Sequence, residues 1–312
     1  MRCLVTGATG QLGSYLTRLL VAQGAEVTAM ARPNSDLWRL EGVLDRIRLV
    51  RGALEDLSPA APELRAAAPD TVFHLAWSGT TVDTRNCPSA LMRNVTGSLE
   101  LFRLSVEAGC NCWIGIGSQA EYGPQAEPLS EDMVPKPNSL YGVSKHCLGQ
   151  LLEGLCAQAG MRFVWLRLLA TYGPKDDPRH MIPFIIEQLL AGGRPSLTAG
   201  DQPWDYLYVE DAVEAIYSTA VLPSTSGFYN LGSGRPDTVR RIAERLRDMI
   251  DPALPLGFGE RLSAPEAIQS LRGDITKLRK ATGWAPQVDL ESGLCKTVEW
   301  HKTRDKSKGP HA

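Results

Sequence analysis

Three glycines at three-residue spacing, Gly7, Gly10 and Gly13, follow a short apolar run in the segment TGATGQLG of this 312-residue chain. Leucines recur at helical spacing after the segment, so the glycines join an expected strand at residues 2–6 to an expected helix at residues 11–23. Such a loop can bring backbone N–H groups up to a phosphate at the positive end of the helix dipole. An ordinary glycine-rich turn has the same local pattern, so the rest of the chain must decide between the two.

The first half of the chain alternates short β-rich runs with amphipathic stretches, which predicts a parallel sheet covered by helices on both faces. The expected fold class is therefore α/β, a Rossmann-type doubly wound sheet. The expected strands cover residues 2–6, 25–31, 47–52, 71–76, 111–117 and 161–168. The expected helices cover residues 11–23, 87–108, 138–159, 180–192, 209–222, 238–250, 274–282 and 290–303.

In the second half the alternation loosens, which predicts a smaller, mostly C-terminal α/β lobe for a substrate. We expect residues 1–172 to form the dinucleotide-binding domain, with a returning segment at about 201–232. The substrate-binding lobe is expected at residues 173–200 and 233–302. Residues 303–312 are polar and basic and are expected to be a disordered tail.

Charge is nearly balanced, with 33 Lys and Arg against 35 Asp and Glu, so bulk charge attracts neither nucleic acid nor an anionic membrane. No apolar run approaches the roughly 18–20 residues that a membrane span needs. Because a strand is expected to begin at once, we expect no signal peptide. The cysteines lack CxxC spacing, and Cys110 and Cys112 are better explained as buried small apolar residues than as metal ligands. We therefore expect a cytoplasmic protein without a metal site.

The segment NSLYGVSKHCLGQLL places Tyr141 and Lys145 four residues apart at the start of an expected helix, so both side chains project from one face. A nearby ammonium favours the phenolate, which lets a phenol exchange a proton with a hydroxyl group near neutral pH. Ser118 ends an apolar run at the carboxyl end of an expected strand, where ligands of parallel sheets bind. Its hydroxyl can hydrogen-bond an oxygen whose charge changes during hydride transfer. Without context, an exposed helical pair and a serine that caps the local backbone also explain these residues.

Together, these segments resemble the extended short-chain dehydrogenase/reductase family, or NAD-dependent epimerase/dehydratase family, in its nucleotide-sugar-modifying branch. The likeness extends over nearly the whole chain and rests on motifs in a fixed order: TGATGQLG, VFHLAW (usually HLAA in the family), RNVTGSLELF, GSQAEYG, YGVSK, LRLLATYGP, WDYLYVEDAVEAI, YNLGSG and TGWAPQVDLESGL. The resemblance implies that the glycine segment is a cofactor loop and that the protein is an enzyme.

The resemblance also implies roles for individual residues. Tyr141 would be the general acid/base, Lys145 would lower its pKa and hold the nicotinamide ribose, and Ser118 would bind the reacting oxygen. Asn94 would steady the active site, and His74 is expected to be a packed, hydrogen-bonded core residue without a catalytic role. The implied cofactor-binding residues are Gly7, Ala8, Thr9, Gly10, Gln11, Leu12, Gly13, Arg32, Leu54, Leu75, Ala76, Asn94, Tyr141 and Lys145.

Family members that prefer NAD usually carry an acidic residue near Ala31, whereas here Ala31 is followed by Arg32. Because an arginine pairs well with a 2′-phosphate, we expect NADP as the cofactor, with NAD as the alternative. Ala53 replaces an acid that often contacts adenine, so adenine binding is expected to rely on Leu54 and the backbone.

The dehydratases that this chain resembles need an Asp–Glu pair directly after the active-site serine or threonine, and here those positions hold Gln119 and Ala120. The 3,5-epimerase/reductases use a cysteine at position 120 together with a histidine in an HxIP segment. This chain keeps only the histidine, His180, which is expected to contact sugar or phosphate or simply to begin a helix. The further expected substrate contacts are Ser118, Gln119, Glu121, Trp204, Arg261 and Arg272, with Glu121 facing either the sugar or solvent.

The chemistry that remains needs only hydride transfer and one proton carrier. The function expected first is an NADPH-dependent 4-ketoreductase acting on an NDP-4-keto-6-deoxyhexose. The alternative is an NDP-sugar 4-epimerase with tightly bound NAD, and a distant alternative is a non-catalytic regulator that senses NADP. The expected partner is a nucleotide-diphosphate sugar, and the resemblance implies a homodimer that packs through the helices near 87–108 and 138–159.

Overall fold

The computed structural model describes residues 1–79, 84–262 and 269–304. Its main sheet has seven parallel strands in the order β10-β6-β5-β4-β1-β2-β3. These strands are β1 (Arg2–Thr6), β2 (Glu26–Ala31), β3 (Arg48–Arg51), β4 (Thr71–His74), β5 (Cys112–Ser118), β6 (Arg162–Leu168) and β10 (Gly227–Leu231). The predicted α/β class and the predicted strands are confirmed. Every residue of β5 is buried, as is typical of a central parallel strand with helices on both faces.

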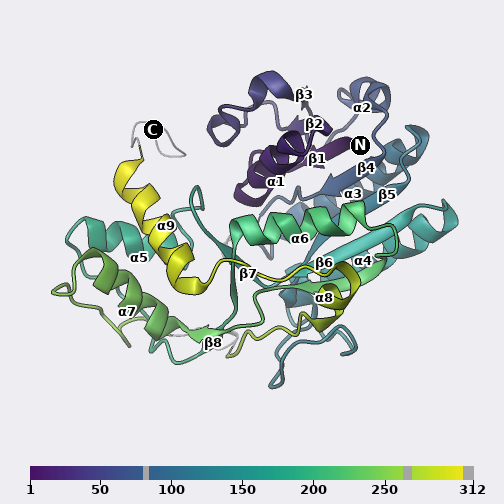
Figure 1. The fold of residues 1–312 in the computed structure, drawn as a ribbon. Helices are drawn as coiled ribbons and strands as arrows, with labels where there is room; N and C mark the ends of the chain where they lie inside the picture. The colour runs from purple at the N-terminus through teal and green to yellow at the C-terminus, as the bar shows by residue number, and fades with distance from the viewer. Residues whose placement is uncertain (80–83, 263–268, 305–312) are drawn as a thin grey trace.

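Helices cover both faces of this sheet (Figure 1). One face carries α1 (Gln11–Ala22), α6 (Val209–Val221) and α8 (Thr276–Thr282), whose apolar side chains share one core with the sheet. The other face carries α2 (Ala61–Ala67), α3 (Pro88–Glu107) and α4 (Leu140–Gln158), which pack around a second group of apolar residues.

A separate apolar core lies beside the sheet, at the left of Figure 1, among α5 (Met181–Leu190), α7 (Val239–Ile250) and α9 (Leu290–Thr303). Two short sheets accompany it, formed by β7 (Ala170–Tyr172) with β9 (Tyr206–Tyr208) and by β8 (Pro203–Trp204) with β11 (Asp237–Thr238). Tyr172 of β7 and Tyr208 of β9 are buried in this core and so attach the first sheet to it. Within the described residues, no helix has the length and apolar character that crossing a membrane requires.

The sequence did not predict α2 or β10. Helix α2 is short, and only Ala61 and Leu64 of its residues are buried, so it lacks a strong apolar period. Strand β10 is defined by its pairing with β6, for example Tyr229 with Leu166, and a partner so distant in the chain leaves no local signal. Most of the predicted tail lies outside the described residues, since α9 ends at Thr303 and residues 305–312 are not described.

The glycine segment forms a tight turn between β1 and α1. Gly7 has a φ of +70°, and a Cβ atom there would lie 2.8 Å from the backbone nitrogen of Ala76. The backbone nitrogen of Gly10 donates to the carbonyl oxygen of Gly7 at 3.0 Å, and Gly10 is the N-cap of α1. A Cβ atom at Gly13 would overlap with that same carbonyl oxygen. The third glycine therefore sets how closely α1 approaches the end of β1.

We expect Gly13→Ala to lower the free energy of unfolding by roughly 1–3 kcal/mol, because the added methyl group meets backbone that cannot rotate away. Gly154→Ala in α4 is the matched control, since Gly154 is exposed and its added Cβ has open space around it. The control should raise the free energy of unfolding by about 0.5–1 kcal/mol. Urea unfolding of both variants measures the two changes. A Gly13→Ala protein as stable as the parent would contradict the packing argument.

Candidate active site

A groove of about 620 Å³ lies at the carboxyl edge of the main sheet. Strands β2 and β4 pair with opposite sides of β1, so the groove sits where the strand order reverses, the usual ligand site of an open α/β sheet. It is lined by the glycine segment, by the ends of β2 and β4, by the 3₁₀ turn Trp38–Leu40, and by residues near the start of α5.

Of the glycine segment, Gly7, Thr9, Gly10, Gln11 and Leu12 line the groove. Ala8 and Gly13 are buried beneath it and support the turn. The N-terminus of α1 opens onto this space, and its first backbone N–H groups and the helix dipole suit a phosphate. The residues present therefore fit the pyrophosphate of a dinucleotide.

The predicted residues at the ends of β2, β3 and β4 also line the groove: Ala31, Arg32, Leu54, Leu75 and Ala76. Arg32 is exposed, and its carbonyl oxygen accepts a hydrogen bond from the Arg51 guanidinium at 3.0 Å. Leu54 is buried and offers an apolar surface at the same end of the groove.

The Ser–Tyr–Lys group, which comprises Ser118, Tyr141 and Lys145, is brought together beside this groove. Ser118 is the last residue of β5, and Tyr141 and Lys145 lie in the first turns of α4. The hydroxyl of Ser139 caps α4 by accepting a hydrogen bond from the backbone nitrogen of Gly142 at 3.1 Å. The Ser118 hydroxyl lies near enough to the Tyr141 phenol to lower its pKa.

Trp77 lies against both Tyr141 and Lys145. The Lys145 ammonium lies 3.9 Å from the centre of the Trp77 ring, and the Tyr141 ring meets the same indole edge-on at 6.0 Å. Trp77 also lines the groove. No role was expected for Trp77 from the sequence, although VFHLAW carries a tryptophan where the family usually has alanine.

Lys145 is buried, and its Nζ donates to the carbonyl oxygen of Ile116 at 2.8 Å. Burial lowers the pKa of Lys145 to about 7, while the charge of Glu121 raises it. The ammonium keeps two stabilising contacts, the carbonyl oxygen and the face of Trp77. These contacts also fix its direction.

Lys145 is not among the groups that shift the pKa of Tyr141 in this arrangement. Burial raises the pKa of Tyr141, with a further increase from Glu121, and the opposing contributions come from Ser118 and Arg85. The reason is geometric, since the Lys145 ammonium is directed to Ile116 and the Trp77 ring. Arg85 was not singled out from the sequence.

His74 is the packed core histidine that the sequence predicted. Its Nδ1 hydrogen-bonds the Thr6 hydroxyl and its Nε2 hydrogen-bonds the Ser98 hydroxyl, both at 2.8 Å. Burial, with a contribution from the Lys145 charge, lowers the pKa of His74 to about 3. Asn94 is also buried, and its side chain both accepts from and donates to the backbone of Ser78 at 2.8 Å. It thereby fixes the chain that follows β4.

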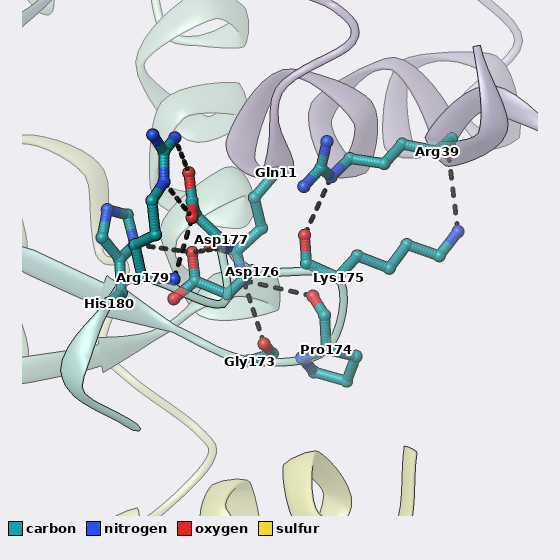
Figure 2. Close-up of polar contacts among 9 residues, drawn as sticks. All are labelled: Gln11, Arg39, Gly173, Pro174, Lys175, Asp176, Asp177, Arg179 and His180. Atoms are coloured by element: carbon teal, nitrogen blue, oxygen red, sulfur yellow. Dashed lines mark hydrogen bonds and ion pairs between the residues drawn. The ribbon is translucent and has the colours of Figure 1, made fainter. Parts of the chain in front are cut away.

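The segment that leads into α5 is bound directly to the glycine segment (Figure 2). The Gln11 amide donates to the carbonyl oxygens of Gly173 and Pro174 at 3.0 and 3.1 Å. The Arg39 guanidinium donates to the carbonyl oxygen of Lys175 at 2.8 Å and to that of Thr9 at 3.3 Å. Arg39 lines the groove and was missed because the segment around it has no regular period.

His180 is the N-cap residue of α5 and lines the groove together with the glycine segment. Its Nδ1 hydrogen-bonds the Asp176 carboxylate at 2.9 Å, as Figure 2 shows. That hydrogen bond raises the pKa of His180, with burial opposing it. Asp177 also lines the groove and is paired with Arg179. The two aspartates were not singled out from the sequence.

The other expected substrate contacts are not among the residues that line the groove. Glu121 faces neither sugar nor solvent, which corrects the prediction: it is fully buried and paired with Arg167 at 2.9 Å. Trp204 packs in an apolar cluster with Leu169 and Leu271. Arg272 is bound to the carbonyl oxygen of Ala126 and to the Ser270 hydroxyl. Gln119 is half-buried in the turn after β5, and Arg261 is exposed.

The parallel sheet, the glycine turn at its reversal point and the adjoining Ser–Tyr–Lys group define a class of dinucleotide-binding α/β enzymes. The family model described as "NAD dependent epimerase/dehydratase family" matches residues 3–232. The chain belongs to this family, and it is an enzyme of the extended short-chain dehydrogenase/reductase type.

Two curated relatives match over almost the whole chain. A dTDP-glucose 4,6-dehydratase of Shigella flexneri is 26% identical, with 96% of this chain and 92% of the relative covered. A UDP-glucose 4-epimerase of Azospirillum brasilense is 28% identical, with 99% and 94% covered.

Solved structures agree with this assignment. A UDP-N-acetylglucosamine 4-epimerase from Methanobrevibacter ruminantium, in complex with UDP-N-acetylmuramic acid, has a TM-score of 0.88 at 25% identity and covers 97% of this chain and 98% of its own. The Thermus thermophilus UDP-glucose 4-epimerase complex with NAD has a TM-score of 0.86 at 26% identity, with 97% and 99% covered.

We expect Asp176→Asn to lower the pKa of His180, because the hydrogen bond to the carboxylate is what stabilises the imidazolium. Since the folded pKa lies above the unfolded value of about 6.5, the pair stabilises the fold fully below that pH, and the contribution is lost as pH rises through the folded pKa. An NMR titration of the assigned imidazole measures the shift. The control is Asp177→Asn, which should change it less because Asp177 is paired with Arg179. Equal shifts in both variants would contradict the assignment to Asp176.

Proposed function

We propose that this enzyme acts on nucleotide-diphosphate sugars by transferring hydride at the sugar C4, as an NADPH-dependent 4-ketoreductase of NDP-4-keto-6-deoxyhexoses. The observation that carries the proposal is the Ser–Tyr–Lys group beside a dinucleotide groove, with no second acid/base pair in the segment after Ser118. The relatives that act on nucleotide sugars support the substrate class.

Each of these side chains has its own role in the proposed reduction. A bound nicotinamide supplies the hydride, and the glycine segment with the start of α1 would hold its pyrophosphate. The Tyr141 phenol gives a proton to the sugar O4 during reduction, and its raised pKa keeps it protonated for that step at neutral pH. The Ser118 hydroxyl hydrogen-bonds the same oxygen as negative charge develops on it. Lys145 would hold the nicotinamide ribose, with its ammonium directed by Ile116 and Trp77.

A 4,6-dehydratase is disfavoured despite the similarity to such enzymes. Gln119 and Ala120 stand where that reaction needs an acid and a base. Glu121 is the nearest carboxylate in the sequence, and it cannot substitute because it is buried and bonded to Arg167 and Trp165. Hydride transfer with a single proton carrier is the chemistry that these residues support.

A 4-epimerase that recycles a bound NAD is the second candidate. Epimerases are among the relatives, and the T. thermophilus relative is in complex with NAD. In that reaction Tyr141 would first remove the proton from the C4 hydroxyl and later return it. Ala31 and Arg32 favour the reductase, because the end of β2 offers a cation and no acid to the adenosine ribose.

We also propose a homodimer that packs through α3 and α4. Both helices expose large apolar side chains, which a second copy of the chain would cover: Met92, Val106, Leu140, Val143 and Leu151.

The two reactions differ in cofactor consumption, which purified enzyme measures directly. With an NDP-4-keto-6-deoxyhexose we expect oxidation of one NADPH for each sugar reduced, read from the loss of NADPH absorbance and from the product. Tyr141→Phe should lower this turnover about 10²–10⁴-fold, because it removes the proton carrier and keeps the ring. Interconversion of NDP-hexoses without net NADPH loss would instead establish the epimerase.

Cofactor preference is tested at Arg32. We expect Arg32→Ala to weaken NADPH binding by about 10–100-fold and to leave NADH binding nearly unchanged, because one charged hydrogen bond to the 2′-phosphate is lost. Arg48→Ala is the control, since Arg48 is an exposed arginine of neighbouring β3 and not among the residues that line the groove. Calorimetric titration with both cofactors gives the ratio. Equal losses for NADPH and NADH would remove the argument for NADP.

A further inference from the structure

Glu121 is a fully buried carboxylate directly behind the Ser–Tyr–Lys group. Its Oε1 accepts hydrogen bonds from the backbone nitrogen of Ser118 at 2.8 Å and from the Trp165 indole at 2.9 Å. Its Oε2 accepts from the Arg167 guanidinium at 2.9 Å. The carboxylate thus links the end of β5 to β6, and its charge acts on both Tyr141 and Lys145.

Glycines of β5 make the space that this group occupies. A Cβ atom at Gly117 would overlap with the Glu121 carboxylate and the Trp165 indole nitrogen. A Cβ atom at Gly115 would lie 2.5 Å from the Trp165 ring. Gly149 of α4 lets the helix pack on the other side of the same indole. Gly117 therefore leaves room for the Glu121 carboxylate, while Gly115 and Gly149 leave room for the indole that donates to it.

Stability alone does not explain this arrangement. Taking a carboxylate and a guanidinium out of water costs several kcal/mol for each ion, and well-packed apolar residues of similar volume often replace such pairs at no loss. Arg167 reaches further to the Tyr122 hydroxyl at 3.1 Å, which in turn donates to Asn230 at 2.6 Å. Both members of the pair have hydrogen-bond partners, and the position of the pair next to Ser118 points to the active site as the reason for its presence.

We propose that Glu121 is a positioning residue of the active site, whose carboxylate holds the backbone of Ser118 through a hydrogen bond and whose negative charge favours the protonated form of Lys145. This inference rests on the proposed function, in which Lys145 acts as a cation beside the cofactor. Glu121 does not itself touch substrate, since it is buried and its oxygens are bonded within the protein.

Among the described residues, Glu121 is the negatively charged group that acts on Lys145. His74 approaches from β4 and is neutral near pH 7, because its pKa is about 3. The Trp77 ring and the Ile116 carbonyl oxygen are uncharged. Tyr141, one turn earlier on α4, is a neutral phenol in this range because its pKa is raised. Removing the charge at position 121 should therefore make Lys145 lose its proton at lower pH.

The test is an NMR titration of the Lys145 ε-carbon resonance in the full-length protein, assigned by its disappearance in Lys145→Arg. In the parent protein the midpoint should lie near a pH of about 7. Glu121→Gln keeps a hydrogen-bond acceptor for Ser118 and Trp165 but removes the charge, so the midpoint should move to lower pH. The pH optimum of turnover should move in the same direction.

Glu131→Gln is the matched control. Glu131 accepts a hydrogen bond from the backbone nitrogen of Asn230 in the same polar network, and it does not contact the Ser–Tyr–Lys group. Its loss should leave the Lys145 midpoint in place. Should Glu121→Gln fail to fold because Arg167 is left unpaired, the double variant Glu121→Gln/Arg167→Gln removes both charges, and the midpoint should again move to lower pH.

An unchanged midpoint in either folded variant would overturn the proposal, and so would an equal shift in Glu131→Gln. The titration needs no substrate, so its outcome is independent of which reaction the enzyme catalyses. A shifted midpoint in a protein without reductase or epimerase activity would leave Glu121 as the group that holds Lys145 charged and would remove the proposed function instead.

Discussion

Helix α4 lies so close to the chain after β5 that a Cβ atom at Gly142 would overlap with the carbonyl oxygen of Ala120. This approach decides where the neighbouring side chains go. Tyr141 meets the Ser118 hydroxyl, and Lys145 reaches the carbonyl oxygen of Ile116 inside β5. Because parallel strands end at one edge of a sheet, the glycine turn after β1 lies at the same edge as Ser118. Both halves of the site thus rest on close backbone contact that glycine permits.

Buried polar groups then determine which direction the reactive side chains face. The Lys145 ammonium is held by a carbonyl oxygen, an indole face and the charge of Glu121. Arg167 connects Glu121 to Tyr122 and onward to β10. In a low-dielectric interior such a network is rigid when every member is bonded and costly when one is missing. These hydrogen bonds suit a site in which two titrating groups must keep fixed positions.

Hydrogen bonds beside the groove connect the main-sheet side of the molecule with the segment that leads into α5. Gln11 and Arg39, on the cofactor side, donate to backbone carbonyl oxygens in the segment that leads into α5 (Figure 2). That segment ends in His180, which Asp176 orients toward its place at the groove. A ligand that spans the groove would therefore touch both the glycine segment and the segment that leads into α5.

The sequence by itself determined what depends on neighbours along the chain: the alternation of strands and helices, the glycine turn, and the pairing of Tyr141 with Lys145 on one helical face. These follow from backbone sterics and helical or strand period, which act over a few residues. The tertiary structure alone decided that β10 completes the sheet, that Glu121 is buried against Arg167, and that Trp77 covers Lys145. Each of these features depends on residues that are far apart in the chain. Burial then shifts the pKa values of the charged groups, which no local sequence pattern shows.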